Sequence, residues 1–556
     1  MTIQETIRGI VENAVSKAQT LNELPDIPIE EITIDRPQNP DHGDFASSLP
    51  LKLTKVMKIP PMIIADKVTS HIEIKGPISK ADVTNPGFIN LFVDSDWLAS
   101  QVELIIKSGD KYGNSDRGSN THIQIEFVSV NPTGPLHVGH ARGAVFGSAL
   151  AEILMASGYK VHREYYFNDA GSQIQKFYSS LYARYMQLFG REEIVPEDGY
   201  QGQYMVELAK DIKRDLGAKY HSMTREDAVS ELGREGINRM VETAKSDMQI
   251  LNVSYDTWFE EKSLFSEGQY DRTMKLLSES GYLTEKDEAT WLKSTSLGDD
   301  EDKVMVRRNG IPTYFATDVA YHYNKFLERR FDRVINVLGA DHQGHARFMK
   351  AVPLAIGINP DRLNLIIYQL VTLKRGQDSV RASKRSGQME TLKDLVDDVG
   401  PDACRFFFLS RSPRSQMEFD LDLAKKQSSE NPVFYIQYAH ARICSILKLA
   451  EKNSIDYSNG NVALLQHEGE TSLIKKMLEF PEIIQSVSET LEPHHLPHYS
   501  VELSTIFHWF YERCRVVSDK PQDVEITKAR LKLVEASRIV LNRCLKLMLM
   551  SAPTEM

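Results

Sequence analysis

Apolar residues change their spacing several times along the chain, and each spacing predicts an element. Residues 123–130 (IQIEFVSV) form an apolar, β-branched run that is typical of a buried strand. After a short turn, apolar residues recur at helical spacing and predict a helix from about residue 139 to residue 157, where Gly158 ends it. A strand, a turn and a helix in this order favour a nucleotide-binding α/β sheet.

The same sheet is expected to resume far downstream. Two further apolar runs, 333–340 and 365–373, predict additional strands. The segment from about residue 186 to residue 310 is charged, has helical spacing and lacks strand alternation, so we expect a mainly helical insertion there. From about residue 400 onward nearly every segment has helical spacing.

The amino-terminal part mixes helix and strand patterns up to about residue 110, and a polar linker that contains glycine follows at 111–120. We therefore expect an α+β amino-terminal domain, a Rossmann-type α/β domain that carries the insertion, a connector and an all-α carboxyl-terminal domain. The expected bounds of these four parts are 1–115, 116–390, 391–430 and 431–556.

Composition restricts the possibilities only a little. A chain of 556 residues is too long for one core, and 41% hydrophobic with 26% charged residues is ordinary for a soluble protein. The net charge of −11 argues against a general nucleic-acid coat but not against a local basic surface. The four cysteines share no CxxC spacing, so we expect no zinc site and reduced thiols in a cytoplasmic protein. No apolar run reaches membrane-spanning length and no signal peptide is recognisable.

The first candidate for chemistry is His137-Val138-Gly139-His140, at the expected strand-to-helix junction. A helix N-terminus offers backbone N–H groups and a positive dipole end to an anion. Gly139 allows a phosphate or ribose to approach the backbone, and the two imidazoles can donate to oxygens that gain charge in nucleotidyl transfer. Taken alone, the four residues fit two histidines that cap a helix or bind a metal equally well.

A second candidate lies in a short basic run, 380–387 (VRASKRSG), after the expected strand 365–373 and before a helix that begins near Thr391. A basic loop at that place can clamp a triphosphate and release it with pyrophosphate. The alternative interpretation is a solvated basic turn.

These two elements resemble the HIGH and KMSKS signatures of class I aminoacyl-tRNA synthetases. Further segments are similar to arginyl-tRNA synthetases in the same order, from about residue 35 to Met556: they are 41–46, 85–90, 126–137, 313–321, 339–345 and 431–442. Two departures stand out in the second signature, where Arg381 and Ala382 replace the first lysine and the methionine. Many relatives carry a lysine shortly before HIGH, at the position of Gly134, so we expect Lys384 to supply that cation here.

The resemblance implies an ATP-dependent, AMP-forming arginine–tRNA ligase. Such an enzyme activates L-arginine with ATP to arginyl-adenylate and pyrophosphate, and then transfers arginine to the terminal adenosine 2′-hydroxyl of tRNA(Arg). It also implies that tRNA must be bound for the first step, that Mg²⁺ accompanies ATP, and that the protein is a monomer. The parts expected above then become a D-loop-binding domain, a catalytic domain, a connector that meets the tRNA stem and an anticodon-binding domain.

The resemblance also assigns roles to residues. His137, His140 and Lys384 are expected to be catalytic, and Gly139, Ser383 and Arg381 to bind ATP with them. The substrate arginine is expected to contact Glu126, Asn131, Tyr314, Asp318 and Gln343. A planar cation with five N–H donors requires carboxylates, which fits Glu126 and Asp318. From the residues alone, ordinary ion pairs with nearby Arg or Lys remain the alternative for both carboxylates.

Two groups of residues are expected to bind tRNA. Tyr435, Tyr438 and Arg442 fall on one helical face and, with Met556, are expected at the anticodon. The second group, Asn85, Phe88 and Asn90, is expected to receive a D-loop base. The alternatives are a buried aromatic stripe in a helical bundle and a strand with one core phenylalanine.

Three other functions stay open from the sequence. Another class I synthetase would share both signatures, and a small-molecule nucleotidyltransferase would share the first. A non-catalytic tRNA-binding paralogue would share the domains, although His137, His140 and Lys384 are all retained here.

Overall fold

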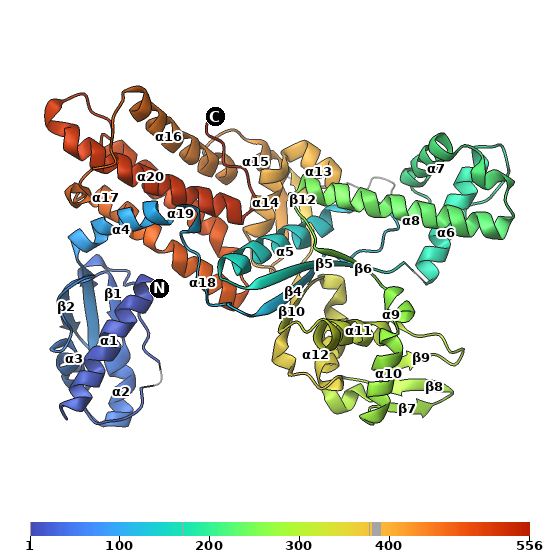
Figure 1. Ribbon diagram of the computed structural model, residues 1–556, viewed down its shortest axis with the longest axis horizontal. Coiled ribbons are helices and arrows are strands. Elements are labelled where there is room, and N and C mark those ends of the chain that lie inside the picture. Colours follow the sequence, from blue (N-terminus) through green and yellow to red (C-terminus); the bar gives the residue numbers. More distant parts are fainter. Residues whose placement is uncertain (1, 30, 170, 377, 381–390) are drawn as a thin grey trace.

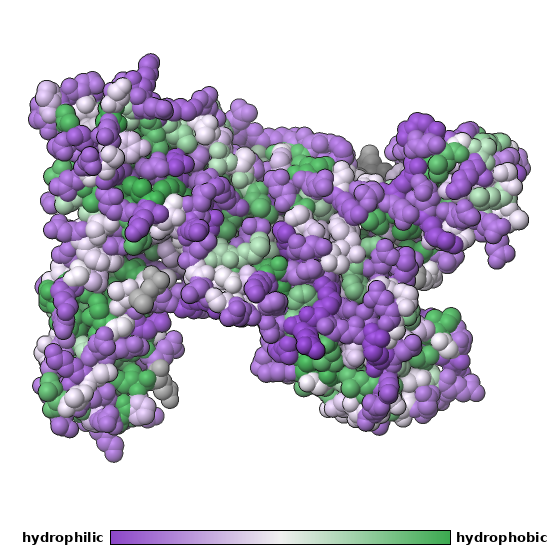
Figure 2. Space-filling view, in the orientation of Figure 1, coloured by the Kyte–Doolittle hydropathy of each residue, from purple (hydrophilic) through white to green (hydrophobic). Residues whose placement is uncertain are grey.

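The computed structural model describes residues 2–29, 31–169, 171–376, 378–380 and 391–556. Figure 1 shows an amino-terminal lobe and a helical carboxyl-terminal part at one end of the molecule, a central sheet, and two further lobes at the other end. Hydrophilic residues cover most of the face drawn in Figure 2. Among the described residues, no helix is both long and apolar enough to cross a membrane.

The amino-terminal lobe is a three-stranded antiparallel sheet with helices on it. The strand order is β1 (Phe45–Ser47), β3 (Phe88–Val93), β2 (Ile78–Thr84), and the helices are α1 (Ile3–Thr20), α2 (Leu49–Met57) and α3 (Pro61–Thr69). A capping box between Thr2 and Glu5 starts α1. The next helix, α4 (Ser95–Ser108), was expected in this domain, but it packs on α17 (Glu468–Leu478) and α20 (Val524–Leu547) of the carboxyl-terminal part.

The central sheet has five parallel strands in the order β11 (Leu363–Tyr368), β10 (Arg333–Gly339), β4 (His122–Phe127), β5 (Lys160–Phe167), β6 (Thr257–Glu260). The chain leaves β4 on one side and returns on the other, so the topological switch point lies between β4 and β10. α5 (Val138–Ala156) follows β4 and is buried along most of its length, as the apolar spacing predicted to within a residue. β4 itself ends at Phe127, earlier than the expected residue 130, because Val128 and Ser129 have positive φ angles of 71° and 47°.

The segment expected at about 186–310 as a mainly helical insertion without strand alternation also contains four short strands, β6–β9. Helices α6 (Ser172–Gln187), α7 (Gln203–Leu216) and α8 (Arg225–Ile250) form one lobe with its own core. β6 then returns to the central sheet as its edge strand. It is followed by α9 (Ser263–Ser266), α10 (Gln269–Glu279) and a small antiparallel sheet of β7 (Leu283–Lys286), β8 (Ala289–Leu292) and β9 (Lys303–Val306).

Two elements connect this region to β10 and β11. α11 (Tyr314–Tyr323) continues into a π-helical turn, Asn324–Glu328, before β10. Between β10 and β11 lie a 3-10 turn, Ala340–His345, and α12 (Ala346–Ala355).

The expected strand 365–373 is divided between two sheets. β11 ends at Tyr368, and β12 (Val371–Arg375) begins a second sheet with β13 (Asp378–Val380) and β14 (Met417–Asp420). β14 is an exception to the expectation that the chain is nearly all helical after residue 400. The remaining helices are α13 (Leu392–Val399), α14 (Pro401–Leu409), α15 (Leu421–Lys425), α16 (Pro432–Lys452), α18 (Phe480–Thr490) and α19 (His495–Arg513).

Candidate functional site

The first signature forms the start of α5. His137 is the N-cap, and its Nδ1 accepts a hydrogen bond from the Gly139 backbone N–H at 3.0 Å. His140 Nδ1 accepts from the His137 backbone N–H at 3.1 Å. Since an acceptor nitrogen carries no proton, each neutral ring is protonated on Nε2 and donates from there. The ring centroids lie 6.2 Å apart, so two N–H donors stand beside the helix N-terminus.

This turn is joined to the segment that flanks the second signature. The residue before His137, Leu136, accepts a hydrogen bond at 2.8 Å through its carbonyl from the backbone N–H of Leu392, in the first turn of α13. His137 also forms an isolated β-bridge with Thr391, the N-cap of α13. The expected ATP-binding residues Arg381, Ser383 and Lys384 lie outside the described residues.

A buried arginine anchors the first turn of α5 from the other side. Arg142 is 1% exposed and donates to three backbone carbonyls, those of Gln369 at 2.8 Å, Ser412 at 2.8 Å and Ser415 at 2.9 Å. Burial lowers the pKa of this guanidinium to about 10. Because Gln369 lies two residues before β12, Arg142 connects the first signature to the base of the β12–β13 hairpin that leads to the second.

Glu126, the first expected arginine ligand, already has a cation. It lies near the carboxyl end of β4, is 7% exposed, and accepts from Lys325 Nζ at 2.6 Å. Lys325 is fully buried in the π-helical turn after α11 and also donates to Asn336 at 3.1 Å. The ion pair that the sequence left as the alternative is therefore present at Glu126.

Asp318 and Tyr314 share α11, as expected. Asp318 Oδ2 accepts from His345 Nε2 at 2.7 Å, and the exposed Tyr314 ring lies with its centroid 5.4 Å from that of His345. Gln343 is exposed in the 3-10 turn after β10. His345, two residues further on, is thus the residue of this turn that reaches Asp318.

Sequence reasoning missed one buried carboxylate at the same edge of the sheet. Glu261 follows β6, is 9% exposed and accepts from the Tyr166 hydroxyl at 2.7 Å. Burial raises its pKa, and the nearby Asp318 and Asp169 carboxylates add to the rise, whereas hydrogen bonds from Tyr166 and Thr317 oppose it. Among the described residues, Glu261 forms no ion pair of its own, and the neighbouring Lys262 pairs instead with Asp169 at 2.6 Å and with Glu260 at 2.8 Å.

Three carboxylates act on the Tyr166 hydroxyl. Burial raises the pKa of its hydroxyl well above the usual value, and the charges of Glu261, Asp318 and Glu126 raise it further. These three residues, one from β4, one from the end of β6 and one from α11, are called the acidic cluster below. With Lys325 on Glu126 and His345 on Asp318, the cluster retains negative charge, which suits a cationic ligand.

Asn131 lies in the turn between β4 and α5, between the acidic cluster and the signature histidines in the chain. Its Oδ1 accepts from the Asn168 backbone N–H at 3.2 Å and its Nδ2 donates to Gln173 Oε1 at 2.9 Å. The side chain therefore holds the turn to the end of β5 and to α6.

The expected D-loop residues line one cavity. Asn85, Phe88 and Asn90 surround a space of about 400 Å³ together with His42 and Asn39. Figure 1 shows that this lobe lies apart from the central sheet. The cavity therefore belongs to the amino-terminal lobe alone.

The expected anticodon residues are separated by the fold. Tyr438, Arg442 and Met556 line a cavity of about 300 Å³ that Tyr511 of α19 completes. The Arg442 guanidinium lies over the rings of Tyr438 and Tyr511, at 4.6 and 5.4 Å from their centroids. Tyr435 does not line this cavity; its ring packs against His508 with centroids 5.1 Å apart, and Tyr438 packs on the same histidine at 6.0 Å.

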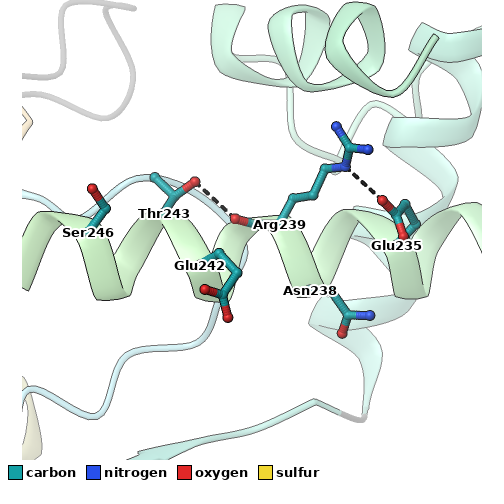
Figure 3. A pocket seen from close by; sticks show the side chains of 6 residues that line it. All are labelled: Glu235, Asn238, Arg239, Glu242, Thr243 and Ser246. Atoms are coloured by element: carbon teal, nitrogen blue, oxygen red, sulfur yellow. Dashed lines mark hydrogen bonds and ion pairs between the residues drawn. The ribbon is translucent and has the colours of Figure 1, made fainter. Parts of the chain in front are cut away.

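A polar groove along α8 offers no comparable arrangement. Figure 3 shows that all of its lining residues lie on this one helix, with Arg239 bonded to Glu235 and Thr243 bonded to the Arg239 carbonyl. Two of its six side chains bond within the same helix, and no other element contributes a side chain to it. The signature turn and the acidic cluster are therefore the better candidate for the site of reaction.

Comparison with known proteins gives matches along the whole chain. Residues 5–93 match the family model "Arginyl tRNA synthetase N terminal domain", 101–407 match "tRNA synthetases class I (R), catalytic domain" and 436–556 match "DALR anticodon binding domain". An "Arginine–tRNA ligase" of Dehalococcoides mccartyi is 52% identical over 556 residues, covering 100% of this chain and 99% of the relative. One from Caldanaerobacter subterraneus is 43% identical, with 100% and 99% covered. The fold is similar to that of Thermus thermophilus arginyl-tRNA synthetase, with a TM-score of 0.78, 20% identity and 100% of both chains covered.

Proposed function

The chain belongs to the arginyl-tRNA synthetase family of class I, and on that premise we propose which of its residues bind arginine, ATP and tRNA. It is an arginine–tRNA ligase, which consumes ATP to join L-arginine to tRNA(Arg). The observation that carries the proposal is the acidic cluster, in which Glu126 and Glu261 are buried and Asp318 is half-buried, at the same edge of the sheet as two imidazole donors.

The guanidinium of the substrate binds between Asp318 and Glu261. Glu126 is matched by Lys325 at 2.6 Å, so its charge is largely neutralised. Glu261 is buried, accepts from the hydroxyl of Tyr166 and lies near the Asp318 carboxylate, and a planar cation with five N–H groups relieves that repulsion. Glu126 then influences the guanidinium site indirectly, through its ion pair with Lys325 and its charge near Tyr166. The exposed Tyr314 forms one wall of that site.

The α-amino and carboxylate end of arginine extends toward the signature turn. Asn131 lies in that turn, and Gln343 follows β10, the neighbouring strand at the switch point. Both are proposed to contact this end of the substrate, as the family resemblance implies.

ATP binds with its α-phosphate at the start of α5. His137 and His140 donate from Nε2 to the α-phosphate oxygens, and Gly139 allows the nucleotide to approach the backbone. A Cβ at Gly139 would have only His137 Nδ1 within 4 Å, at 3.3 Å. Arg381, Ser383 and Lys384 are proposed to hold the β- and γ-phosphates. Mg²⁺ accompanies ATP on phosphate oxygens and water, since imidazoles and backbone N–H groups suit an anion rather than this cation.

The reaction has two steps. The arginine carboxylate oxygen attacks the α-phosphorus in line, the bond to the bridging oxygen breaks, and pyrophosphate leaves with that electron pair. The imidazole N–H groups stabilise the charge on the equatorial oxygens. In the second step the 2′-hydroxyl of the terminal adenosine attacks the adenylate carbonyl, loses its proton and displaces AMP.

The two small cavities outside the sheet are proposed to bind tRNA. The cavity at Asn85, Phe88 and Asn90 suits one unstacked base of the D-loop, and the cavity at Tyr438, Arg442 and Met556 suits one base of the anticodon loop. Tyr435 supports the second cavity through α16 rather than by contact.

Arginine-dependent exchange of pyrophosphate into ATP tests this proposal, measured with and without tRNA and with lysine, glutamate and cysteine as controls. We expect exchange with arginine alone among these amino acids, and only when tRNA is present. Exchange with lysine would contradict the arginine pocket, and exchange without tRNA would contradict the coupling of activation to tRNA binding. A monomeric, cytoplasmic enzyme is part of the same proposal, and sedimentation with and without tRNA tests the monomer.

A further inference from the structure

His345 joins two elements of the proposed arginine site. It ends the 3-10 turn Ala340–His345 after β10, and its Nε2 donates a hydrogen bond at 2.7 Å to Oδ2 of Asp318 on α11. Of the hydrogen bonds among the described residues, this one alone reaches the Asp318 carboxylate. The Asp318 side chain is 26% exposed, so its carboxylate can still accept from a ligand while His345 holds it.

Packing fixes the direction in which the His345 ring donates. The ring centroids of Tyr314, Phe315 and Phe348 lie 5.4, 5.4 and 5.1 Å from that of His345. The first two rings belong to α11, which also carries Asp318, and the third belongs to α12. A ring in contact with three others has few orientations open to it. Its N–H therefore points to Asp318 before any substrate is bound.

The same turn carries Gln343, which is proposed above to contact the α-amino and carboxylate end of arginine. Asp318, proposed for the guanidinium, lies on α11. Because the His345 hydrogen bond fastens the turn to α11, it fixes the distance between the groups proposed for the two ends of the substrate. A displacement of about 1 Å between two such groups is enough to weaken the binding of a ligand that spans them.

We propose that His345 is a positioning residue for the substrate arginine: its Nε2–H orients the Asp318 carboxylate for the guanidinium and holds the Gln343 turn against α11. The inference deepens the arginine site proposed above and rests on it. A carboxylate that is already oriented loses less conformational freedom when the guanidinium binds, so arginine binds more tightly. If His345 only reduced the negative charge at Asp318, its removal would instead tighten the binding of a cation.

Two substitutions of His345 separate the donor from the ring. His345→Leu keeps an apolar group among the aromatic rings but has no donor, whereas His345→Gln keeps an N–H donor. In aminoacylation at saturating ATP and tRNA, we expect His345→Leu to raise KM for arginine about tenfold, the usual effect of one lost hydrogen bond to a charged group. We expect kcat to stay within about twofold, because the contact holds the bound substrate and the transition state alike. His345→Gln should keep KM within about threefold of the wild type.

Binding without turnover gives a second readout. Equilibrium dialysis of radiolabelled arginine, with tRNA present and ATP omitted, measures Kd for arginine directly. We expect this Kd to rise about tenfold in His345→Leu, while the melting temperature without ligand stays within a few degrees of the wild type. A lower melting temperature with an unchanged Kd would show a merely structural role and would overturn the inference.

His342→Leu is the matched control. His342 is exposed in the same turn, and its Nε2 lies 3.7 Å from the carboxylate of its neighbour Asp341 rather than beside Asp318. This variant should keep the wild-type KM for arginine. An unchanged or lower KM in His345→Leu would overturn the inference, and so would an equal rise in His345→Leu and His345→Gln, because the donor would then have no part in it.

Asp318→Asn distinguishes a failure of this inference from a failure of the proposed arginine site. We expect it to raise KM for arginine about tenfold or more, and His345→Leu added to it should raise KM no further, because both changes act on one contact. Full additivity of the two changes would overturn the positioning role alone. A wild-type KM in Asp318→Asn would overturn the arginine site itself, and the role of His345 with it.

Discussion

Two backbone amides decide which nitrogen of each signature histidine carries the proton. The N–H of Gly139 and the N–H of His137 occupy the two Nδ1 atoms, at 3.0 and 3.1 Å, so both rings donate from Nε2. The same hydrogen bond makes His137 a helix cap. At the scale of the residue, His137 thus uses Nδ1 to cap the helix, and Nε2 is the nitrogen proposed to take part in the reaction.

His137→Asn separates these two roles. Asn is among the best N-cap residues and can accept from Gly139, but it has no group at the place of Nε2. We expect a melting temperature within a few degrees of the wild type and a kcat for arginine activation lower by a factor of about 10²–10³, the usual size for one lost transition-state donor. A kcat within threefold of the wild type would contradict the donor role.

Glu164 makes the stability of the fold depend on pH in the acid range. It is fully buried on β5 and accepts from Arg329 at 2.9 and 2.5 Å and from Tyr321 at 2.6 Å. Burial alone would raise its pKa, but His162 and Arg329 lower it from 4.5 to about 2. The ion pair therefore contributes stability above pH 4.5, of the order of 3 kcal/mol, and loses it as the pH falls toward 2.

Urea unfolding of wild type and Glu164→Gln at several pH values checks this. The free energy difference between the two proteins should be largest near pH 7 and shrink below pH 4.5. A difference that stays constant down to pH 3 would mean that Glu164 does not titrate as described.

At this scale, the sequence was enough to propose residues that belong to a contiguous motif, such as His137, His140 and Asp318, and their roles stay predictions. It could not assign the partner of Glu126, because Lys325 lies 199 residues away and reaches it only through a π-helical turn. It also missed Glu261, which follows a strand of four residues that is too short for an alternating pattern to be visible.

Elements meet the site at their ends, and Arg142 shows how they are held there. Its guanidinium satisfies carbonyls from the β11–β12 turn and from the segment between α14 and β14. That contact explains why the apolar run 365–373 is two strands: the chain bends at Gln369, whose carbonyl points to Arg142 instead of a neighbouring strand. The periodicity of a single run carries no signal of such a tertiary contact.

Arg142→Met should leave the carbonyls of Gln369 and Ser415 without this donor, whereas the Ser412 carbonyl still accepts from Ser415. Each buried unsatisfied group costs about 1–3 kcal/mol, so we expect a loss of about 2 kcal/mol or more in the free energy of unfolding. Lysine is a point charge without the planar fork of arginine, so the free energy of unfolding of Arg142→Lys should lie between those of the wild type and Arg142→Met. Urea unfolding measures all three proteins, and a loss below about 1 kcal/mol for the Met variant would show that the carbonyls find other donors.

Across the whole molecule, the domain order could be read from the sequence, but the way that the parts pack could not. α4 follows the amino-terminal lobe in the chain and yet packs on α17 and α20. Arg405 of α14, fully buried, donates to the carbonyl of Leu251 at the end of α8 at 2.6 Å and to Ser148 of α5 at 2.9 Å. It also donates to the carbonyl of Met548, at the end of α20. One side chain therefore joins the insertion, the signature helix and the carboxyl-terminal helices.

The anticodon cavity allows a test at the same scale. Removal of Met556 or Tyr438→Ala takes away one wall of the cavity, so we expect KM for tRNA to rise about tenfold, roughly the value of one stacked base, with KM for arginine unchanged. Tyr435→Phe is the control, since Tyr435 lies against His508 outside the cavity. Aminoacylation kinetics at varied tRNA concentration measure KM for tRNA in each variant. An equal effect of all three changes would mean that they act through the packing of α16.

The most direct test of the account is KM for arginine in Glu261→Gln compared with Glu126→Gln, measured by aminoacylation at saturating ATP and tRNA. If the guanidinium lies between Asp318 and Glu261, Glu261→Gln should raise KM for arginine by about 10–100-fold, the loss of one charge-assisted contact, while kcat changes little. Glu126→Gln should instead lower stability, because Lys325 loses its partner in the interior. A normal KM for arginine in Glu261→Gln, together with a large rise of this KM in Glu126→Gln, would contradict the proposed site. It would indicate that the guanidinium binds Glu126.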